Sequence, residues 1–176
     1  TPNPRTHFDY SDYGGLGGAV DMCSGLGACR KTLDGTMCPS YMATRDEEHT
    51  TRGLANALRA VLSGQVPAAD FAGERLYEVM DLCLECKGCK AECPANVDMA
   101  KMKYEFLHHY HAVNGQPLRN RLFGHIATLS WIGSRLAPIS NWIARSWPNR
   151  CLMERVAGID RRRPLPRFAR ERLLFS

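Results

Sequence analysis

Apolar residues recur at helical spacing through most of the chain. Over residues 44–62 one face of the expected helix is apolar, formed by Leu54, Leu58, Val61 and Leu62. Acidic residues at 46–48 favour a helix start there, because they complement the positive end of the helix dipole. Ser63-Gly64, followed by Pro67, predicts the end of this helix. A second amphipathic pattern predicts another helix over residues 69–83.

Two further helical stretches follow these. Asp98 is a good N-cap for a helix that runs to about Val113, and Asn114-Gly115 predicts its end. Residues 118–147 mix bulky apolar side chains with arginines, and Pro138 is expected to divide them into two helices. Because the alternation typical of strands is absent from the sequence, we expect an all-α fold.

The same pattern divides the chain into three parts. Residues 1–22, rich in glycine, aspartate and tyrosine, are expected to form a lead-in segment. Residues 23–115 are expected to form one helical domain, which holds seven of the eight cysteines. Residues 116–176 are expected to form an amphipathic helical extension that ends in a basic connector.

Composition and charge narrow the class of protein. With 44% apolar and 23% charged residues, the chain is an ordinary globular protein. No run approaches the roughly 18 uninterrupted apolar residues of a membrane-spanning helix, and no secretory signal is evident. We therefore expect a cytoplasmic location, with the inner face of the membrane as the alternative.

The net charge of +5 is concentrated late in the chain, in Arg161-Arg162-Arg163 and the arginines that follow. No nucleic-acid motif accompanies these arginines, so nucleic-acid binding is not expected. For the arginine-rich segment, the favoured interpretation is that it is solvated or faces a protein partner. For residues 118–147, the favoured interpretation is packing on a neighbouring domain. Peripheral membrane association is the alternative for both.

Four cysteines form a compact run, Cys83-x2-Cys86-x2-Cys89-x3-Cys93-Pro94. This is the C-x2-C-x2-C-x3-C-P pattern of bacterial ferredoxins, in which thiolates bind [4Fe–4S] clusters. Zinc sites usually split their ligands into two separated pairs, and thiols two residues apart make poor structural disulfides. The run therefore predicts a [4Fe–4S] centre in an α-helical ferredoxin-like domain.

The upstream cysteines repeat this pattern imperfectly. Cys23 and Cys29 are five residues apart, with Leu26 where another cysteine would stand, and Cys38-Pro39 follows after a longer gap. In two-cluster ferredoxins the cysteine before proline ligates the other cluster. A crossed assignment follows, in which one [4Fe–4S] centre is held by Cys38, Cys83, Cys86 and Cys89, and a second centre by Cys23, Cys29 and Cys93.

The second centre has only three thiolates, because Leu26 cannot bind iron. A cubane that lacks one ligand tends to lose that iron and leave [3Fe–4S], and the C-x5-C spacing resembles the three-iron motif of succinate dehydrogenase iron–sulfur subunits. A [4Fe–4S] cluster with an oxygen or nitrogen ligand is one alternative, and an empty or structural site is another. Cys151 stands alone among apolar neighbours and is expected to be a core residue.

Lys87 and Lys90 lie beside the ligands of the cysteine run. Positive charge near a cluster raises its reduction potential, so both lysines are candidates for tuning it. The alternative is that they only solvate the loop.

Several motifs together resemble one family. They are Gly35-Thr36-Met37-Cys38-Pro39-Ser40, Thr44-Arg45-Asp46-Glu47, Thr51-Arg52-Gly53 and the run from Leu82 to Pro94. These elements are similar to the iron–sulfur segment of bacterial FAD-linked oxidases, which are FAD- and iron–sulfur-containing D-2-hydroxyacid dehydrogenases of the D-lactate and D-2-hydroxyglutarate type. The resemblance covers roughly residues 8–170. The Cys-Pro blocks by themselves are shared with glycolate oxidase and anaerobic glycerol-3-phosphate dehydrogenase iron–sulfur subunits.

The resemblance implies an FAD-binding domain upstream and a cysteine-rich domain or electron acceptor downstream. It implies that electrons reach the clusters from reduced FAD, which is held in the partner domain and not in this chain. The sequence shows no flavin site, substrate-binding arginine cluster or catalytic base, so the chain alone is not expected to be a dehydrogenase.

The main expectation is therefore an electron-transfer module of a D-2-hydroxyacid dehydrogenase. One alternative is a stand-alone ferredoxin-like adaptor subunit of a glycolate oxidase or glycerol-3-phosphate dehydrogenase type complex. Another is a cluster that serves as a structural staple or redox sensor without electron flow.

Overall fold

The computed structural model describes residues 4–67 and 71–169. These residues form helices and connecting loops without strands, so the predicted all-α fold is confirmed. The chain divides into two compact units, Thr1–Gly115 and Gln116–Ser176. Within the described residues, no helix is both long enough and apolar enough to cross a membrane.

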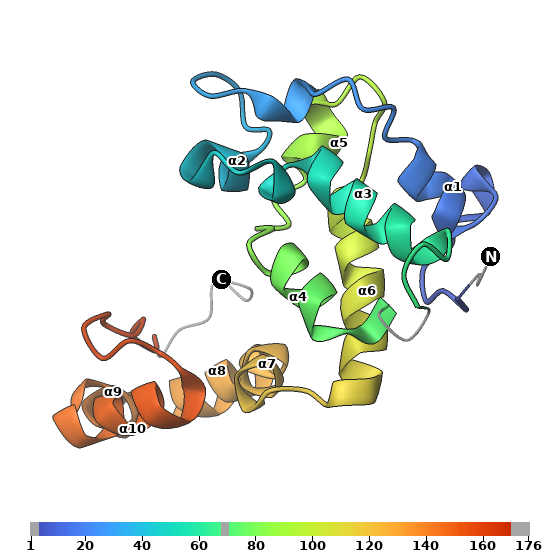
Figure 1. The fold of residues 1–176 in the computed structure, drawn as a ribbon. Coiled ribbons are helices and arrows are strands. Elements are labelled where there is room, and N and C mark those ends of the chain that lie inside the picture. The colour runs from blue at the N-terminus through green and yellow to red at the C-terminus, as the bar shows by residue number, and fades with distance from the viewer. Residues whose placement is uncertain (1–3, 68–70, 170–176) are drawn as a thin grey trace. The chain divides into compact units, whose positions relative to one another are not determined.

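The first unit is built on three helices that pack against one another, α3 (Thr51–Leu62), α4 (Glu74–Asp81) and α6 (Met99–Asn114). The short helix α1 (Leu16–Asp21) packs on α3 and α6 (Figure 1). The remaining elements are single turns or short helices: η1 (Ser11–Tyr13), η2 (Ala28–Arg30), α2 (Pro39–Thr44), η3 (Glu47–His49) and α5 (Gly88–Glu92).

The core of this unit joins the apolar faces of these helices. Its most buried large side chains include Leu16, Val20, Leu54, Leu58, Met80, Met99 and Phe106. Two of them belong to α1, within the segment that was expected only to lead into the domain. Leu16 and Val20 are four residues apart and therefore share one face of a helix, which is the sequence signal for their role.

The helix boundaries follow local capping groups. The helix predicted from residue 44 begins at Thr51, because the Thr50 hydroxyl accepts a hydrogen bond from the Gly53 N–H at 2.8 Å and caps it. The preceding acidic residues belong to η3, where Asp46 accepts from the Glu48 N–H at 3.0 Å. The helix predicted over 69–83 corresponds to α4, which begins at Glu74 and ends at Asp81. Residues 68–70 lie outside the described part of the chain.

The helix predicted to begin after Asp98 is confirmed as α6. The Asp98 carboxylate accepts a hydrogen bond from the Lys101 N–H at 3.1 Å, as expected of an N-cap. The helix extends one residue past the predicted end, through Asn114, and Gly115 follows with a positive φ of 79°. Such a conformation is easiest for glycine, which explains why the helix ends there.

Replacement of Phe106 by alanine is expected to destabilise the first unit by about 3–5 kcal/mol, because it leaves a cavity in the core. The Phe106 side chain is fully buried, and its ring packs against the rings of Phe71 and Tyr110. Chemical denaturation of the variant gives the change in unfolding free energy. Val113→Ala is the control on the same helix, since Val113 is 73% exposed and its loss is expected to change stability by less than about 0.5 kcal/mol. Equal decreases in the free energy of unfolding of the two variants would contradict the assignment of Phe106 to the core.

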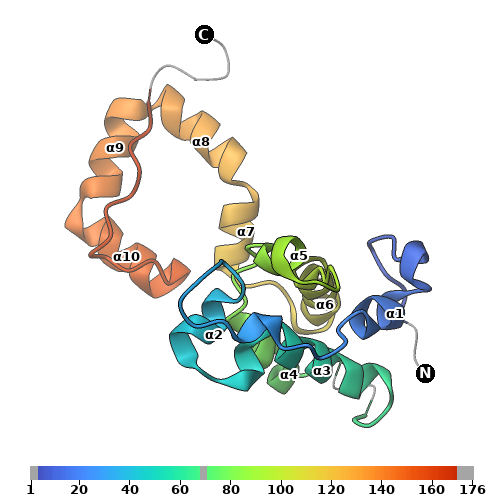
Figure 2. The ribbon, with the colours of Figure 1, turned by 90° about the horizontal axis from the view of Figure 1, so that it is seen from above.

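The second unit contains four consecutive helices, α7 (Leu118–Gly124), α8 (Ile126–Arg135), α9 (Ala137–Arg145) and α10 (Trp147–Ala157). Each packs on the next and α10 returns to α7, so that the helices curve round one another (Figure 2). The predicted break at Pro138 is confirmed, with the proline in the first turn of α9. A further break at His125, which the sequence pattern did not predict, divides the first of the two expected helices.

The expected connector after residue 158 is held to the second unit. The Asn141 side chain accepts a hydrogen bond from the Phe168 N–H at 2.9 Å and donates one to the Phe168 carbonyl at 3.0 Å. The Phe168 ring covers Gly133, where an added Cβ would lie only 2.5 Å from a ring carbon. Residues 164–169 form no helix, and two hydrogen bonds hold them to Asn141 at Phe168.

Candidate iron–sulfur site

Cysteines from two distant segments line one pocket in the first unit. Cys83, Cys86 and Cys89 belong to the segment between α4 and the first turn of α5, and Cys38 is the N-cap of α2. Apolar side chains such as Leu54 and Met99 complete the lining. The structure thus brings together the four side chains predicted to hold the first centre.

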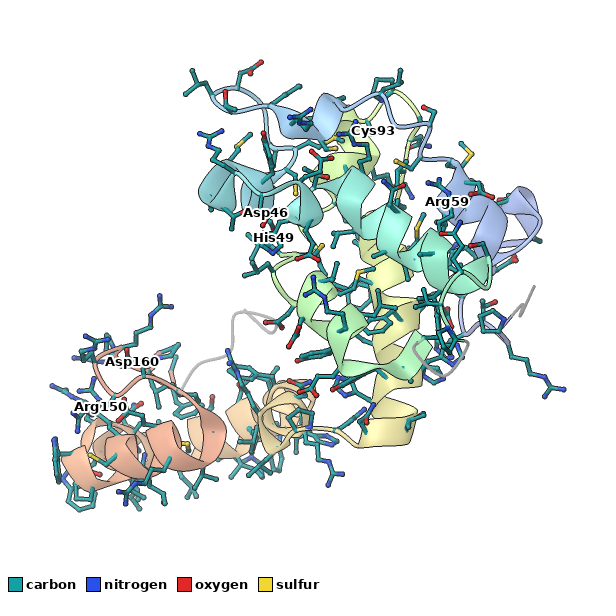
Figure 3. All side chains as sticks on the ribbon, in the orientation of Figure 1. Asp46, His49, Arg59, Cys93, Arg150 and Asp160 are labelled. Carbon is teal, nitrogen blue, oxygen red and sulfur yellow. The ribbon has the colours of Figure 1, made fainter. Side chains whose placement is uncertain are left out.

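The other three predicted ligands line a second pocket. Cys23 and Cys29 lie at the two ends of a loop, and Cys93 follows α5 as its C-cap (Figure 3). Leu26 also lines this pocket, is 71% exposed and offers no donor atom. Cys151 lies in α10 of the second unit, apart from both groups in the sequence. Which of the grouped cysteines bind iron stays a prediction.

The chemistry of the donor set fits iron–sulfur clusters. All eight cysteines lie within the described residues and all are free thiols. Within the same residues, no three His, Cys, Asp or Glu side chains converge on the position of a single metal ion. A mononuclear zinc site needs its ligands about 2.0–2.3 Å from one point, whereas a cubane distributes its thiolates over separate irons. The cysteines that line the two pockets supply the kind of ligand that a cubane requires.

Burial and backbone hydrogen bonds act in opposite directions on the thiols of the first pocket. Burial raises the pKa of Cys83 and of Cys89 above the ordinary value. Hydrogen bonds from backbone N–H groups lower the pKa and so oppose this shift. The Glu85 N–H acts on Cys83 in this way. Three N–H groups act on Cys89, those of Met99, Lys90 and Ala100. If these thiols held a cluster, they would bind it as thiolates, and the same N–H groups would stabilise the negative charge on sulfur.

The loop of the cysteine run has an uncommon backbone that wraps the pocket. Glu85 and Lys87 both adopt left-handed conformations, with φ of 55° and 59°. Such conformations in residues other than glycine concentrate at functional sites. Gly88, between Lys87 and Cys89, allows a close approach, because a Cβ there would lie 3.2 Å from Thr36 Cγ2 and would require Thr36 to shift slightly. The close approach of Thr36 brings the segment before Cys38 against the run.

Glu92 holds that segment in place and was not identified from the sequence. Its carboxylate accepts hydrogen bonds from the Thr36 N–H at 2.6 Å and the Met37 N–H at 3.2 Å, and it pairs with Lys31 at 3.4 Å. These bonds lower the pKa of Glu92, the largest effect coming from the Thr36 N–H. One side chain in α5 therefore positions the residues that lead into Cys38.

Replacement of Glu92 by alanine is expected to loosen the segment 31–38 without unfolding the unit. Because the Thr36 and Met37 N–H groups lose their acceptor, hydrogen exchange at both amides should become several-fold faster. Glu78→Ala is the matched control, since Glu78 is an exposed carboxylate whose ion pair with Arg75 lies within one turn of α4. Unchanged exchange at Thr36 in the Glu92 variant would contradict this role.

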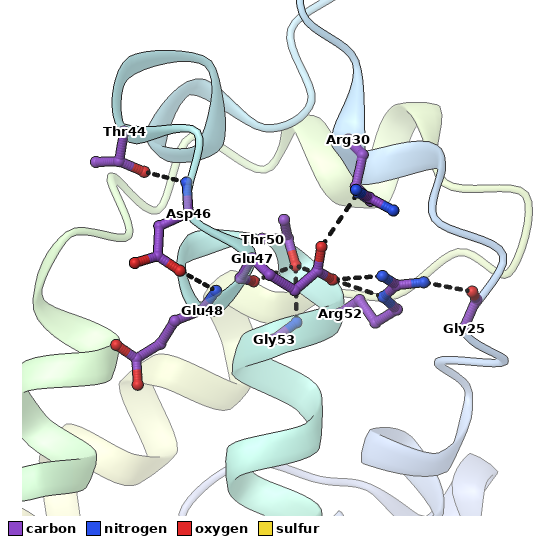
Figure 4. Close-up of polar contacts among 9 residues, drawn as sticks. All are labelled: Gly25, Arg30, Thr44, Asp46, Glu47, Glu48, Thr50, Arg52 and Gly53. Carbon is purple, nitrogen blue, oxygen red and sulfur yellow. Dashed lines mark hydrogen bonds and ion pairs between the residues drawn. The ribbon is translucent and has the colours of Figure 1, made fainter.

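The loop of the second pocket is tied to α3 by arginines. Arg52 donates to the Gly25 carbonyl at 3.1 Å and pairs with Glu47, which also pairs with Arg30 at 3.1 Å (Figure 4). Gly53 allows this turn, because a Cβ there would lie 2.3 Å from the Glu47 carbonyl oxygen. The Thr-Arg-Gly and Thr-Arg-Asp-Glu motifs thus belong to one network that supports the cysteine loop.

Arg59 makes a second tie, about two turns further along α3. It donates to the Cys23 carbonyl at 3.0 Å and the Val20 carbonyl at 3.2 Å, and pairs with Asp21 at 2.8 Å. Periodicity could not indicate this role, because an arginine on the polar face of a helix is indistinguishable from a solvated one. The two arginines fix the entry and the middle of the Cys23–Cys29 loop.

Comparisons with known proteins cover these same residues. Residues 21–98 match a family described as the 4Fe-4S dicluster domain. D-2-hydroxyglutarate dehydrogenase of Pseudomonas putida is 27% identical over 172 residues, which cover 78% of this chain and 17% of that protein. D-2-hydroxyglutarate dehydrogenase of Escherichia coli is 25% identical over 178 residues, with 81% of this chain and 17% of that protein covered. The chain is homologous to a segment of these dehydrogenases.

The homology confirms the predicted resemblance to FAD-linked oxidases. All seven cysteines of the two pockets lie within the matched residues 21–98, so the dicluster match spans both groups. The chain spans about a sixth of the length of the curated relatives that it matches, and the relatives therefore contain further domains. No solved structure matches the chain.

Proposed function

We propose that this chain is the electron-transfer module of a flavin-dependent D-2-hydroxyacid dehydrogenase, acting on D-lactate or D-2-hydroxyglutarate. Electrons enter from reduced FAD in an upstream domain and leave to a downstream acceptor, such as a cysteine-rich domain. The homology to D-2-hydroxyglutarate dehydrogenases supports this proposal. The chain itself contributes the iron–sulfur part of the reaction.

The observation that carries the proposal is the closeness of the two cysteine pockets. Met37 and Thr51 line both of them, so these two side chains form a shared wall. Met37 is 2% exposed and Thr51 is 3% exposed, so the wall excludes water. Two neighbouring redox centres in one buried region suit stepwise passage of electrons, in which the protein's contribution is to position the cofactors.

The protein residues have distinct roles in this proposal. Cys38, Cys83, Cys86 and Cys89 hold a [4Fe–4S] cluster, and Cys23, Cys29 and Cys93 hold a second cluster of the [3Fe–4S] or [4Fe–4S] type. When bound, the clusters supply one-electron carriers whose potentials depend on charge, burial and hydrogen bonds to sulfur. Glu92 and Arg52 set the positions of the two loops, and the buried wall keeps water away from the region between them.

The test uses the full-length enzyme under anaerobic conditions. Addition of D-2-hydroxyglutarate or D-lactate is expected to bleach the flavin and then to produce the EPR signal of a reduced cluster. The L-enantiomers are the control and should do neither. In a Cys86→Ser variant the flavin should still bleach, while the signal of the first centre is lost. If substrate bleaches the flavin but only dithionite reduces the clusters, the proposal fails and the staple or sensor alternative is favoured.

The second unit is proposed to be the surface that contacts other domains of the enzyme. Residues 116–176 contain twelve of the 23 basic residues and three of the 18 acidic residues. Large apolar side chains remain exposed on the four helices, including Trp142 at 74% and Trp147 at 70%. Exposed aromatic groups among arginines are typical of protein interfaces. Binding to anionic vesicles by the full-length enzyme would instead favour peripheral membrane association.

A further inference from the structure

A buried lysine lies beside the first cysteine pocket. Lys103, on α6, is 6% exposed, and its Nζ donates hydrogen bonds to the Cys83 carbonyl at 2.7 Å and the Asp81 carbonyl at 3.3 Å. Burial of a lysine is rare unless the charge is paired. The hydrogen bond to the Cys83 carbonyl places the ammonium beside the backbone of a proposed cluster ligand.

The partner of this lysine is a residue of the cysteine run itself. Glu85 Oε1 lies 3.3 Å from Lys103 Nζ, and the side chains are only 22% and 7% exposed. Glu85 also lines the first pocket, between Cys83 and Cys86 in the sequence. It accepts a hydrogen bond from Tyr104, and this bond raises the pKa of the tyrosine. A positive and a negative charge thus lie together at one side of the pocket.

Charges in this position act strongly on a cluster. The interaction between two charges weakens with the dielectric constant, which is lower inside a protein than in water. The two lysines of the cysteine run are less favourably placed. Lys87 is exposed, and Lys90 is exposed and already paired with Asp98 at 3.0 Å. Solvent screens both of them, whereas Lys103 is shielded.

We propose that Lys103 and Glu85 set the reduction potential of the first centre in opposite directions. Reduction adds negative charge to a cluster, so Lys103 raises the potential and Glu85 lowers it. Lys103 is a positioning and tuning residue and touches no substrate. The inference deepens the proposed function and rests on it, because it requires a cluster held by Cys38, Cys83, Cys86 and Cys89.

A purely structural role for Lys103 is the competing explanation. Its two carbonyl acceptors lie at the C-terminal end of α4, so the ammonium also caps that helix. Glutamine at position 103 removes the charge but retains N–H donors for the carbonyls. Glu85→Gln removes the negative charge while keeping the shape of the side chain. A structural role predicts no relation between the two variants, whereas the charge role predicts opposite shifts.

The experiment is an EPR-monitored redox titration of the full-length protein, after iron and sulfide have been quantified. The signal that is lost in Cys86→Ser is assigned to the first centre. Its midpoint potential is expected to fall in Lys103→Gln, to rise in Glu85→Gln and to lie between these values in the double variant. Lys87→Gln is the matched control, with the same chemical change at an exposed position of the run, and should shift the potential least.

The outcomes separate this inference from the proposed function. Shifts in the same direction, or no shift larger than that of Lys87→Gln, would overturn the charge role although the cluster is present. A wild-type protein without any cluster overturns the inference and the proposed function together. If Lys103→Gln fails to fold, Glu85→Gln decides the matter alone, since a potential that does not rise overturns the inference.

Discussion

Replacement of Cys38 by serine is expected to abolish the stable [4Fe–4S] cluster of the first centre. Cys38 shares a pocket with Cys83, Cys86 and Cys89, so its loss leaves three thiolates for four irons. Anaerobically purified Cys38→Ser protein should therefore contain less iron and sulfide than the wild type. It should also lack the EPR signal that dithionite produces from this centre.

Cys93→Ser provides the decisive comparison. Cys93 lines the pocket of Cys23 and Cys29, so its replacement should affect the second centre and leave the first intact. Cys151→Ser, in α10, removes a thiol from the second unit and should affect neither centre. The opposite result, with the first centre lost in Cys93→Ser and fully stable in Cys38→Ser, would show that the run binds a cluster by itself. The crossed assignment would then be wrong.

Sequence patterns indicated the helices whose signal is local. α6 was predicted almost to the residue, because its cap at Asp98 and its stop at Asn114-Gly115 are both local features. The start of α3 was missed, because Thr50 and the acidic residues before it are all acceptable caps and only packing selects among them. The break at His125 follows Gly124, the last residue of α7, but a single glycine within an apolar helical pattern is a weak stop signal, so the break was not predicted.

In the candidate site, too, sequence predicted the features with a local signal and did not predict those that depend on the fold. Cysteine spacing predicted which thiols would gather, because cluster chemistry restricts ligand spacing strongly. The supporting residues carry no such restriction. Glu92 and Thr36 are 56 positions apart, and Arg59 and Cys23 are 36 positions apart, so only the fold brings each pair together. Lys103 was overlooked for the same reason, since nothing in its own helix indicates that Glu85 lies 3.3 Å away.

The substitution Leu26→Cys is expected to complete the second centre. Leu26 lines the pocket of Cys23, Cys29 and Cys93, and stands between two glycines, Gly25 and Gly27, with φ of 77° and 76°. Both glycines tolerate this left-handed backbone, so the loop can present a cysteine without strain. A fourth thiolate allows a [4Fe–4S] cluster where three thiolates favour [3Fe–4S].

The measurement is EPR of anaerobically purified protein in its oxidised state. A [3Fe–4S] cluster gives a signal in this state and an intact [4Fe–4S] cluster does not, so the signal of the wild type should disappear in Leu26→Cys while the iron content rises. Leu33→Cys is the matched control, because Leu33 is 93% exposed and lies outside both pockets, and its signal should persist. Oxygen must be excluded, since air converts four-iron clusters into three-iron ones. If wild type and Leu26→Cys have equal iron and no oxidised-state signal, Leu26 does not limit the second centre, and an oxygen or nitrogen ligand or an empty site takes its place.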